Sequence, residues 1–277
     1  MKLAFCTCVK LGLSCIEKVY SLGGKFDLLI TLEDNLALKK SGRIFLDEIS
    51  EKHDTNLLKI NHINDEIVAE TIKKYDIDWL FLIGWSQIAN INVLQSCKKG
   101  VVGAHPTLLP RGRGRAAIPW AIIKGLDKTG VTFFKMDEGV DTGNILGQNE
   151  IKLEKNETAT TLYEKVNNSH IKLIEEVWRK IDDNSLTEII QENQKSTYWE
   201  GRKPSDGEIF PNKMTINEID RLVRATTKPY PGAFVLKNKS KLIIWEGQKG
   251  KALDGIKIKC IDGYYTATNY QKVSLSK

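Results

Sequence analysis

The chain has 277 residues, of which 41% are apolar and 27% are charged, the proportions of an ordinary soluble globular protein. At roughly 100–200 residues per domain, this length predicts one large domain and a smaller one. The formal net charge of +6 is a mild excess without a basic block long enough for a nucleic-acid-binding arm. It therefore indicates a lysine-rich surface or a site for an anionic ligand such as a nucleotide diphosphate.

The apolar runs and the cysteines argue against a membrane-spanning, secreted or zinc-binding protein. No apolar run approaches the roughly 20 residues that span a bilayer, and the N-terminus lacks an apolar segment followed by a cleavage site. The five cysteines are odd in number and lack zinc-type spacing, which predicts reduced thiols and no metal site. Cys6 and Cys8 share one face of a strand pattern and are expected in a core. We expect a cytoplasmic protein that does not bind a membrane.

Short apolar segments alternate with helical patterns through the first half of the chain. Helices are predicted over residues 12–21 and 64–75, the second with Asn64 as its N-cap, and Ser41-Gly42 predicts a turn. The segments interpreted as strands are residues 2–8, 26–32, 57–60, 78–84, 101–104 and 131–135. This alternation predicts a doubly wound α/β fold with a mostly parallel, Rossmann-like sheet, in which sites lie outside the carboxyl ends of the strands.

The second half begins with a predicted strand over residues 144–153 and a long amphipathic helix over residues 159–181, which closes the first domain. After a polar connector, a helix over residues 214–226 begins with a capping box made by Thr215 and Glu218. Alternating segments then predict a small β-rich module. The predicted divisions of the chain are a catalytic domain over residues 1–183, a connector over residues 184–204 and a C-terminal domain over residues 205–277.

Residues 100–143 (GVVGAHPTLLPRGRGRAAIPWAIIKGLDKTGVTFFKMDEGVDTG) hold the candidate active centre. His105 ends one predicted strand, and Asp141 lies in an acidic loop after another. Side chains that follow two strands can meet at one edge of a sheet, so we expect His105 and Asp141 to lie together. The phosphate-loop, dinucleotide, H-E-x-x-H and G-x-S-x-G patterns are absent from the chain, so this pair is the best candidate for chemistry.

Two segments, HPTLLPRGRGRAAIPWAI and TGVTFFKMDEGVDTG, strongly resemble the formyltransferase family that uses 10-formyltetrahydrofolate. That family includes glycinamide ribonucleotide formyltransferase, methionyl-tRNA formyltransferase and the sugar N-formyltransferases. The matching positions are His105, Leu108-Leu109-Pro110, Arg113-Gly114, Pro119, Thr129-Gly130-Val131-Thr132 and the run from Asp137 to Gly143. A looser resemblance continues through WEGRKPSDGEI and RLVRATTKPYPGAF into the C-terminal module.

The resemblance implies that His105 and Asp141 are catalytic. An imidazole can polarise the formyl oxygen or move protons near neutral pH, and a carboxylate can orient and stabilise the imidazole or relay the proton of the amine. One position departs from the family, which has an asparagine where this chain has Gly103. The loss of an oxyanion donor costs about 10²–10³ in rate, so Gln87, a backbone N–H or a water must replace it, or the activity is impaired.

The resemblance also implies where two substrates bind. The co-substrate 10-formyltetrahydrofolate is expected to pair its flat pterin with backbone groups under a cover of apolar side chains. The residues predicted to bind it are Ile83, Gly84, Trp85, Ser86, Gln87, Ile88, Asp137 and Gly139. The residues predicted to bind the acceptor are Pro106, Thr107, Arg113, Arg115, Arg202 and Arg224. Guanidinium groups match pyrophosphate oxygens, although a structural role is an equal alternative for each arginine.

Three acceptors compete within the family. The short C-terminal module and the small net charge argue against tRNA, and the presence of that module argues against glycinamide ribonucleotide. The stretch LITLEDNLALKKSGR looks most like the sugar members, which predicts a nucleotide-linked 4-amino-4,6-dideoxysugar as acceptor and no nucleic-acid partner. The alternatives are methionyl-tRNA formylation and a non-enzymatic relic that binds folate or a sugar nucleotide. The β-rich module also predicts a homodimer.

Overall fold

The structure is a computed structural model, which describes residues 1–39, 43–237 and 240–275. The predicted turn at Ser41-Gly42 lies outside the described residues. The chain forms two compact units. The first contains Met1–Arg113, Gly130–Glu150 and Val166–Tyr198, and the second contains Gly114–Thr129, Ile151–Lys165 and Trp199–Lys277.

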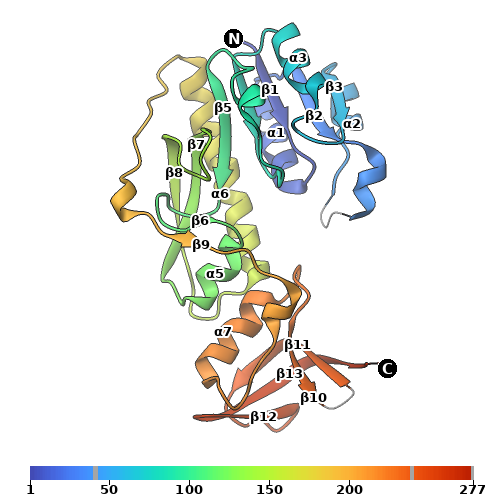
Figure 1. Cartoon of the computed structure of the whole chain (residues 1–277), viewed down its shortest axis with the longest axis vertical. Helices are drawn as coiled ribbons and strands as arrows, with labels where there is room; N and C mark the ends of the chain where they lie inside the picture. Colours follow the sequence, from blue (N-terminus) through green and yellow to red (C-terminus); the bar gives the residue numbers. More distant parts are fainter. Residues whose placement is uncertain (40–42, 238–239, 276–277) are drawn as a thin grey trace. The chain divides into compact units, whose positions relative to one another are not determined.

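A seven-stranded sheet is the framework of the first unit, in the order β3-β2-β1-β4-β5-β7-β8 (Figure 1). Its strands are β1 (Leu3–Cys6), β2 (Leu28–Leu32), β3 (Asn56–Ile60), β4 (Trp79–Leu82), β5 (Gly100–His105), β7 (Lys128–Lys135) and β8 (Ile145–Lys152). The strands from β3 to β5 pair in parallel, whereas β5 and β7 are antiparallel. Every residue of β1, β2 and β4 is buried, as continuous apolar runs require.

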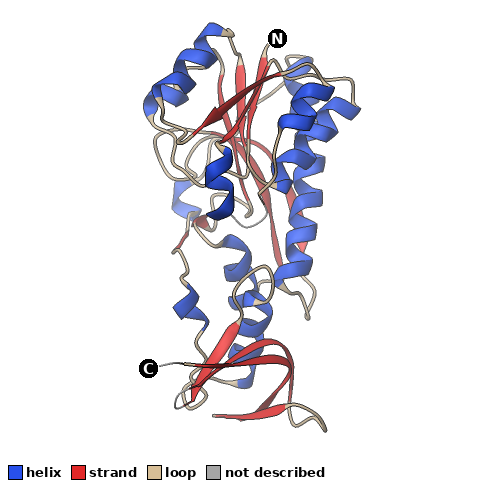
Figure 2. Cartoon of the chain, turned by 90° about the vertical axis from the view of Figure 1, so that its right-hand side faces the viewer, coloured by secondary structure: helices blue, strands red, loops and turns tan. Residues whose placement is uncertain are grey.

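Helices lie on both sides of this sheet (Figure 2). The helices and 3₁₀ segments of this unit before β7 are α1 (Lys10–Ser21), η1 (Asp34–Lys39), α2 (Asp47–Lys52), α3 (Glu66–Lys74) and α4 (Ile91–Leu94), whereas α5 (Ala117–Ile123) belongs to the second unit. The long helix α6 (Ala159–Asp182) follows β8, and Lys18 of α1 forms an ion pair of 2.8 Å with its Glu175. A separate apolar cluster joins Val68 and Ile72 of α3 to the strands. The predicted doubly wound, mostly parallel α/β fold is confirmed.

The start of α3 differs from the prediction. Its N-cap is Asp65, not Asn64. The Asn64 side chain instead bridges to the loop after β4, where its Oδ1 accepts a hydrogen bond from the Asn90 backbone N–H at 2.8 Å and its Nδ2 donates to the Ile88 carbonyl at 3.0 Å. A tertiary contact has therefore taken the polar side chain that local spacing assigned to a cap. The predicted strands and helices of the first half are otherwise present, with bounds that differ from the predicted ones by up to three residues.

The C-terminal part of the second unit is an antiparallel sheet in the order β10-β11-β13-β12. Its strands are β10 (Ala233–Lys237), β11 (Ser240–Lys249), β12 (Ile256–Cys260) and β13 (Gly263–Ser274). The helix α7 (Ile216–Thr226) packs Ile219 and Val223 against this sheet. The predicted capping box is confirmed, because Thr215 Oγ1 accepts from the Glu218 backbone N–H at 3.2 Å and Glu218 Oε2 accepts from the Thr215 backbone N–H at 2.7 Å.

The remaining elements are short. They are β6 (Arg113–Gly114), which pairs with β9 (Tyr198–Trp199), and the 3₁₀ segments η2 (Asn193–Lys195) and η3 (Pro204–Gly207). In the described part of the chain, no helix is both long and apolar enough to cross a bilayer.

Candidate active site

His105 is the last residue of β5, and it is buried, with an exposed fraction of 6%. Its Nε2 lies 2.7 Å from the backbone carbonyl oxygen of Gly112. Because a carbonyl oxygen can only accept a hydrogen bond, the proton of this contact belongs to Nε2. The other ring nitrogen, Nδ1, lies 3.5 Å from Oδ2 of Asp141. The structure therefore brings the two predicted catalytic side chains together, and it orients the imidazole with a backbone carbonyl that the sequence did not suggest.

The route by which Asp141 reaches His105 differs from the expectation of a shared sheet edge. The pairing of β5 with β7 is antiparallel and sets His105 opposite Thr132 and Val102 opposite Lys135. The carboxyl end of β7 thus lies beside the middle of β5. The loop over residues 136–144 has to bring Asp141 back toward His105. Asp141 adopts a left-handed backbone conformation in this loop, with φ 55°.

Gln191 holds the Asp141 loop from a distant part of the chain. Its side-chain Nε2 donates to the carbonyl oxygens of Asp141 at 2.9 Å and Gly143 at 2.7 Å. Gln191 is itself buried, and its Oε1 accepts from Nε and Nη2 of Arg113 at 3.2 and 2.8 Å. Sequence reasoning missed Gln191, because it lies in a polar connector with neither periodicity nor a motif to single it out.

Gly103, the position where the family has asparagine, faces a filled space. It pairs with Phe134 of β7. A Cβ atom at Gly103 would lie 2.9 Å from both Met136 Cγ and Phe134 Cζ, closer than real Cβ contacts allow. A larger side chain at this position requires both neighbours to move.

Gln87 was one of the candidates to replace the missing donor, and its side chain is engaged elsewhere. Its Oε1 accepts from the Ile63 backbone N–H at 2.8 Å and from Trp85 Nε1 at 3.2 Å. Its Nε2 donates to the Asn61 carbonyl at 3.2 Å. Gln87 therefore organises the loop after β4, and a backbone N–H or a water remains the candidate replacement.

The residues predicted for the folate co-substrate lie in two loops. After β4, Ile83 is fully buried, Trp85 is half-buried against the apolar cluster, and Ser86 and Ile88 are exposed. Gly84 has a left-handed φ of 71°, and a Cβ there would lie 2.5 Å from Val9 Cγ2, so the turn requires glycine.

The second of these loops follows β7. There the Asp137 Oδ1 accepts from the Gly139 backbone N–H at 3.1 Å and from Thr142 Oγ1 at 2.6 Å, which fixes the loop ahead of Asp141. The role of both segments in folate binding stays a prediction.

The predicted acceptor residues fall into different surroundings. Pro106 and Thr107 follow His105, and the Thr107 carbonyl accepts from Thr132 Oγ1 at 2.7 Å. Arg113 is buried and donates to Gln191 and Asn193. These partners favour the structural alternative for Arg113.

Arg224 is also engaged within the protein. It pairs with Asp220 at 3.0 Å, and its Nη1 donates to the Glu157 carbonyl at 2.6 Å. Arg115 is exposed and Arg202 is half-buried. Phosphate binding by any of these four arginines stays a prediction.

Arg202 lines a cavity of about 270 Å³ in the second unit. Its guanidinium lies 5.0 Å above the ring of Trp120, and its Nη2 donates to the Asp206 carbonyl at 2.6 Å. Burial lowers the pKa of Arg202 from its usual value. Tyr230 lines the same cavity, and its hydroxyl lies 2.9 Å from that of Tyr163. Lys203 and Thr226 also line it, and the remaining walls are proline, glycine and alanine, so the cavity combines two cationic side chains with a mostly apolar surface.

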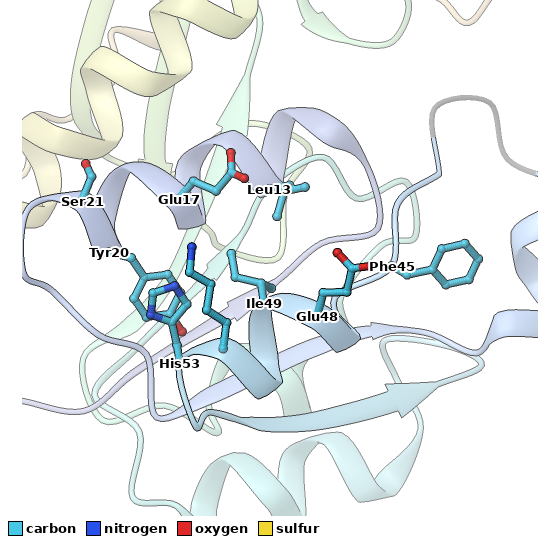
Figure 3. A pocket seen from close by; sticks show the side chains of 9 residues that line it. Leu13, Glu17, Tyr20, Ser21, Phe45, Glu48, Ile49 and His53 are labelled. Atoms are coloured by element: carbon cyan, nitrogen blue, oxygen red, sulfur yellow. The ribbon is translucent and has the colours of Figure 1, made fainter.

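A larger groove of about 400 Å³ lies on the first unit between α1 and α2 (Figure 3). The rings of Tyr20 and His53 stack in it with their centroids 3.7 Å apart, and Glu17 and Glu48 add negative charge. No predicted site residue lines this groove. Among the described residues, no group of three or more His, Cys, Asp or Glu side chains could hold a metal ion.

Comparison with known proteins shows which family this chain resembles. The profile described as "Formyl transferase" matches residues 29–178, and the profile described as "Formyl transferase, C-terminal domain" matches residues 202–272. The bifunctional polymyxin resistance protein ArnA of Wigglesworthia glossinidia brevipalpis is 33% identical over 238 residues, which are 86% of this chain and 36% of that protein. This chain therefore spans about a third of that relative.

Two further comparisons are with a methionyl-tRNA formyltransferase and with an N-formyltransferase of known structure. A methionyl-tRNA formyltransferase of Lachnospira eligens is 26% identical over 248 residues, covering 89% of this chain and 78% of the relative. The crystal structure of the N-formyltransferase from Helicobacter canadensis, in complex with folinic acid and dTDP-3-aminofucose, has a TM-score of 0.72 and 19% identity, covering 98% of this chain and 100% of that chain. The profile matches confirm the predicted formyltransferase enzyme. With both its N-terminal and its C-terminal profile matched, the chain belongs to the formyl transferase family.

Proposed function

We propose that this protein transfers the formyl group of 10-formyltetrahydrofolate to the amine of a nucleotide-linked 4-amino-4,6-dideoxysugar. The observation that carries the chemistry is the buried His105 imidazole with the Asp141 carboxylate 3.5 Å from its Nδ1. The donor supplies a formyl carbon bonded to nitrogen. In the reaction, a bond forms between the acceptor amine nitrogen and this carbon, the bond from the carbon to the folate nitrogen breaks, and one proton moves from the amine to the leaving nitrogen.

His105 and Asp141 handle that proton in the proposed mechanism. The Nε2 proton is directed at the Gly112 carbonyl, which leaves Nδ1 as the nitrogen that faces Asp141. A proton taken from the amine lies between Nδ1 and the carboxylate, where both groups stabilise it. The same pair then returns the proton to the leaving nitrogen. Burial of His105 keeps bulk water away from this exchange and strengthens the attraction between a protonated ring and the carboxylate.

The residues available for the folate support this proposal. A flat pterin needs apolar cover and backbone hydrogen bonds. Ile88 after β4 and Val140 in the Asp141 loop have large apolar side chains with exposed fractions of 77% and 48%. Gly84 has no side chain of its own and is exposed, so a ligand can approach the backbone of the loop after β4 closely there.

Two observations support a sugar nucleotide as acceptor. The solved N-formyltransferase from Helicobacter canadensis, whose fold this chain shares, was crystallised with dTDP-3-aminofucose. The cavity beside Arg202 pairs a guanidinium, which suits phosphate oxygens, with apolar walls that suit a deoxysugar methyl group. Methionyl-tRNA is the second candidate, since the similarity to the Lachnospira eligens enzyme runs over 89% of the chain.

The test is a mass-spectrometric screen of nucleotide-linked amino sugars, with charged initiator tRNA as a competing acceptor and 10-formyltetrahydrofolate as donor. We expect one amino sugar to gain the mass of a formyl group. His105→Ala should lower kcat/KM by about 10²–10⁴, because the proton-handling group is lost, whereas the exposed His62→Ala serves as the matched control. Formylation of tRNA and of no amino sugar would refute the acceptor. The absence of turnover with every acceptor would refute formyl transfer and favour a binding relic.

A further inference from the structure

The Asp141 loop needs an external constraint. Asp141 has a left-handed φ of 55°, and the loop must return from the carboxyl end of β7 to place the carboxylate beside His105. A non-glycine residue adopts this conformation at a cost and keeps it only when its surroundings hold it there.

Gln191 supplies that constraint. Both hydrogen bonds from its Nε2 end on carbonyl oxygens of the loop, at 2.9 Å for Asp141 and 2.7 Å for Gly143. The two acceptors lie on either side of Thr142, so one buried amide fixes the backbone around the candidate catalytic carboxylate. Gln191 has an exposed fraction of 5%, and water therefore competes poorly for these carbonyls.

Arg113 determines which way the Gln191 amide points. An amide has one acceptor end and one donor end, and a guanidinium can only donate. Arg113 donates through Nε and Nη2 to Gln191 Oε1, so Nε2 must face the loop. Asn193 Oδ1 accepts a further bond from Arg113 Nη2 at 2.7 Å and anchors the guanidinium.

The same short segment also holds the histidine. Gly112, the residue before Arg113, presents the carbonyl oxygen that lies 2.7 Å from His105 Nε2. Gly112 therefore contacts the imidazole directly. Arg113, the next residue, contacts the Asp141 loop through Gln191. A displacement of this segment would change the separation between Nδ1 and Oδ2.

We propose that Gln191 is a positioning residue for formyl transfer, which sets the place of Asp141 against His105, and that Arg113 fixes the orientation of its amide. The inference rests on the proposed function. It assigns Gln191 no contact with either substrate, so the loss of its donor should reduce kcat and leave KM nearly unchanged.

The experiment compares Gln191→Glu with Gln194→Glu in the full chain. Gln191→Glu keeps an acceptor for Arg113 but replaces the donor with a carboxylate oxygen facing two carbonyls. We expect kcat to fall by roughly 10²-fold, since a misplacement of about 1 Å can have that effect, with KM within about threefold. Gln194 lies in the same segment and is exposed, so Gln194→Glu makes the same chemical change away from the loop. It should leave kcat within about twofold of the wild type.

A double substitution tests whether the effect passes through Asp141. In an Asp141→Asn background, Gln191→Glu should lower kcat by less than about threefold further, because residues that act as a unit are not additive. An equal loss in both backgrounds would show a general structural role and overturn the inference. Wild-type kcat for Gln191→Glu would overturn it as well.

A crystal structure of Gln191→Glu gives an answer that does not depend on turnover. We expect the separation of His105 Nδ1 and Asp141 Oδ2 to increase and Asp141 to leave the left-handed region. An unchanged site would refute the inference even if no acceptor were found, whereas an inactive wild type with a displaced Asp141 in the variant would refute only the proposed function. If Gln191→Glu does not fold, Arg113→Lys, which lacks the guanidinium fork, is expected to show the same displacement, and an undisturbed Asp141 would then refute the proposal.

Discussion

At the scale of single residues, the two candidate catalytic side chains are held by neighbours that belong to one short segment. Gly112 contributes a backbone carbonyl to His105, and the adjoining Arg113 orients Gln191. Arginines that a sequence pattern suggests for phosphate binding thus serve partly as internal donors. The physical reason is that a buried guanidinium must have its N–H groups satisfied, and Arg113 is 3% exposed.

Replacement of Gly103 with asparagine, the residue of the family, is expected to impair this protein. The new Cβ would lie 2.9 Å from Met136 Cγ and Phe134 Cζ, so we expect a loss of about 1–3 kcal/mol in the free energy of unfolding, measured by urea denaturation, and no gain in kcat. Gly103→Ala separates the steric effect of the Cβ from that of the amide. A large gain in kcat for Gly103→Asn at unchanged stability would contradict the packing argument and show that the native site lacks only a donor.

At the scale of elements, α6 carries a second buried histidine close enough to the site to be coupled to it. Burial lowers the pKa of His170 to about 4, its hydrogen bond to the Val166 carbonyl opposes the change, and charge on His105 adds to it. The ring of His170 lies 5.7 Å from that of Phe133 in β7, and its Nδ1 lies 2.8 Å from the Val166 carbonyl oxygen. His170 thus stays neutral in the folded protein near neutral pH and packs within the first unit.

The lowered pKa of His170 predicts acid sensitivity. The unfolded chain takes up a proton on this residue near the ordinary histidine pKa of 6.5, but the folded protein does so only near 4. The contribution of His170 to the free energy of unfolding is therefore fully present above pH 6.5. It is lost as the pH falls from 6.5 to 4, by about 3 kcal/mol in total. His170→Gln can still donate to Val166 and cannot take up the proton, so urea denaturation between pH 7 and pH 4 should show a shallower decline. The control His62→Gln should follow the wild type, and identical curves for His170→Gln would disprove the assignment.

The direction in which β7 pairs with β5 is a second feature at the scale of elements that shapes the site. The apolar run of β7 predicts a strand but not its direction, and the antiparallel register with β5 moves its carboxyl end away from His105. The loop over residues 136–144 compensates for this. Its hydrogen bonds, among them the one from Thr142 to Asp137 and those from Gln191, restore the approach of Asp141.

At the scale of the whole molecule, the salt dependence of the reaction rate is expected to distinguish a tRNA acceptor from a nucleotide-linked sugar. The chain carries only +6 over 277 residues. An RNA acceptor with 6–10 phosphate contacts would weaken by about 10³–10⁵ between 50 and 200 mM salt. A nucleotide diphosphate offers few charges, and we expect its KM to rise by less than about tenfold over that range. The measurement is the change of KM with salt concentration, taken from initial rates at four salt concentrations. The folate donor is kept saturating, and a neutral osmolyte serves as control. A steep slope would favour tRNA.

Sequence patterns sufficed for the elements and for the expectation that His105 and Asp141 lie together. The fully apolar runs of β1, β2 and β4, the capping box of α7 and the motif around His105 each depend on neighbours within a few residues, and such local patterns are visible without the fold. The Asn64 cap failed for the opposite reason, because its side chain found partners at residues 88 and 90 instead.

The arrangement of the site came from contacts between residues far apart in the chain. Arg113 and Gln191 are 78 residues apart, Gln191 and Asp141 are 50 apart, and Gly103 meets Met136 across an antiparallel pair. None of these positions has a periodicity or a local partner that indicates its role. The hydrogen bonds form because packing buries the polar groups and leaves each only one set of partners. Burial and strand direction, which are properties of the folded chain, therefore place the Asp141 carboxylate beside His105.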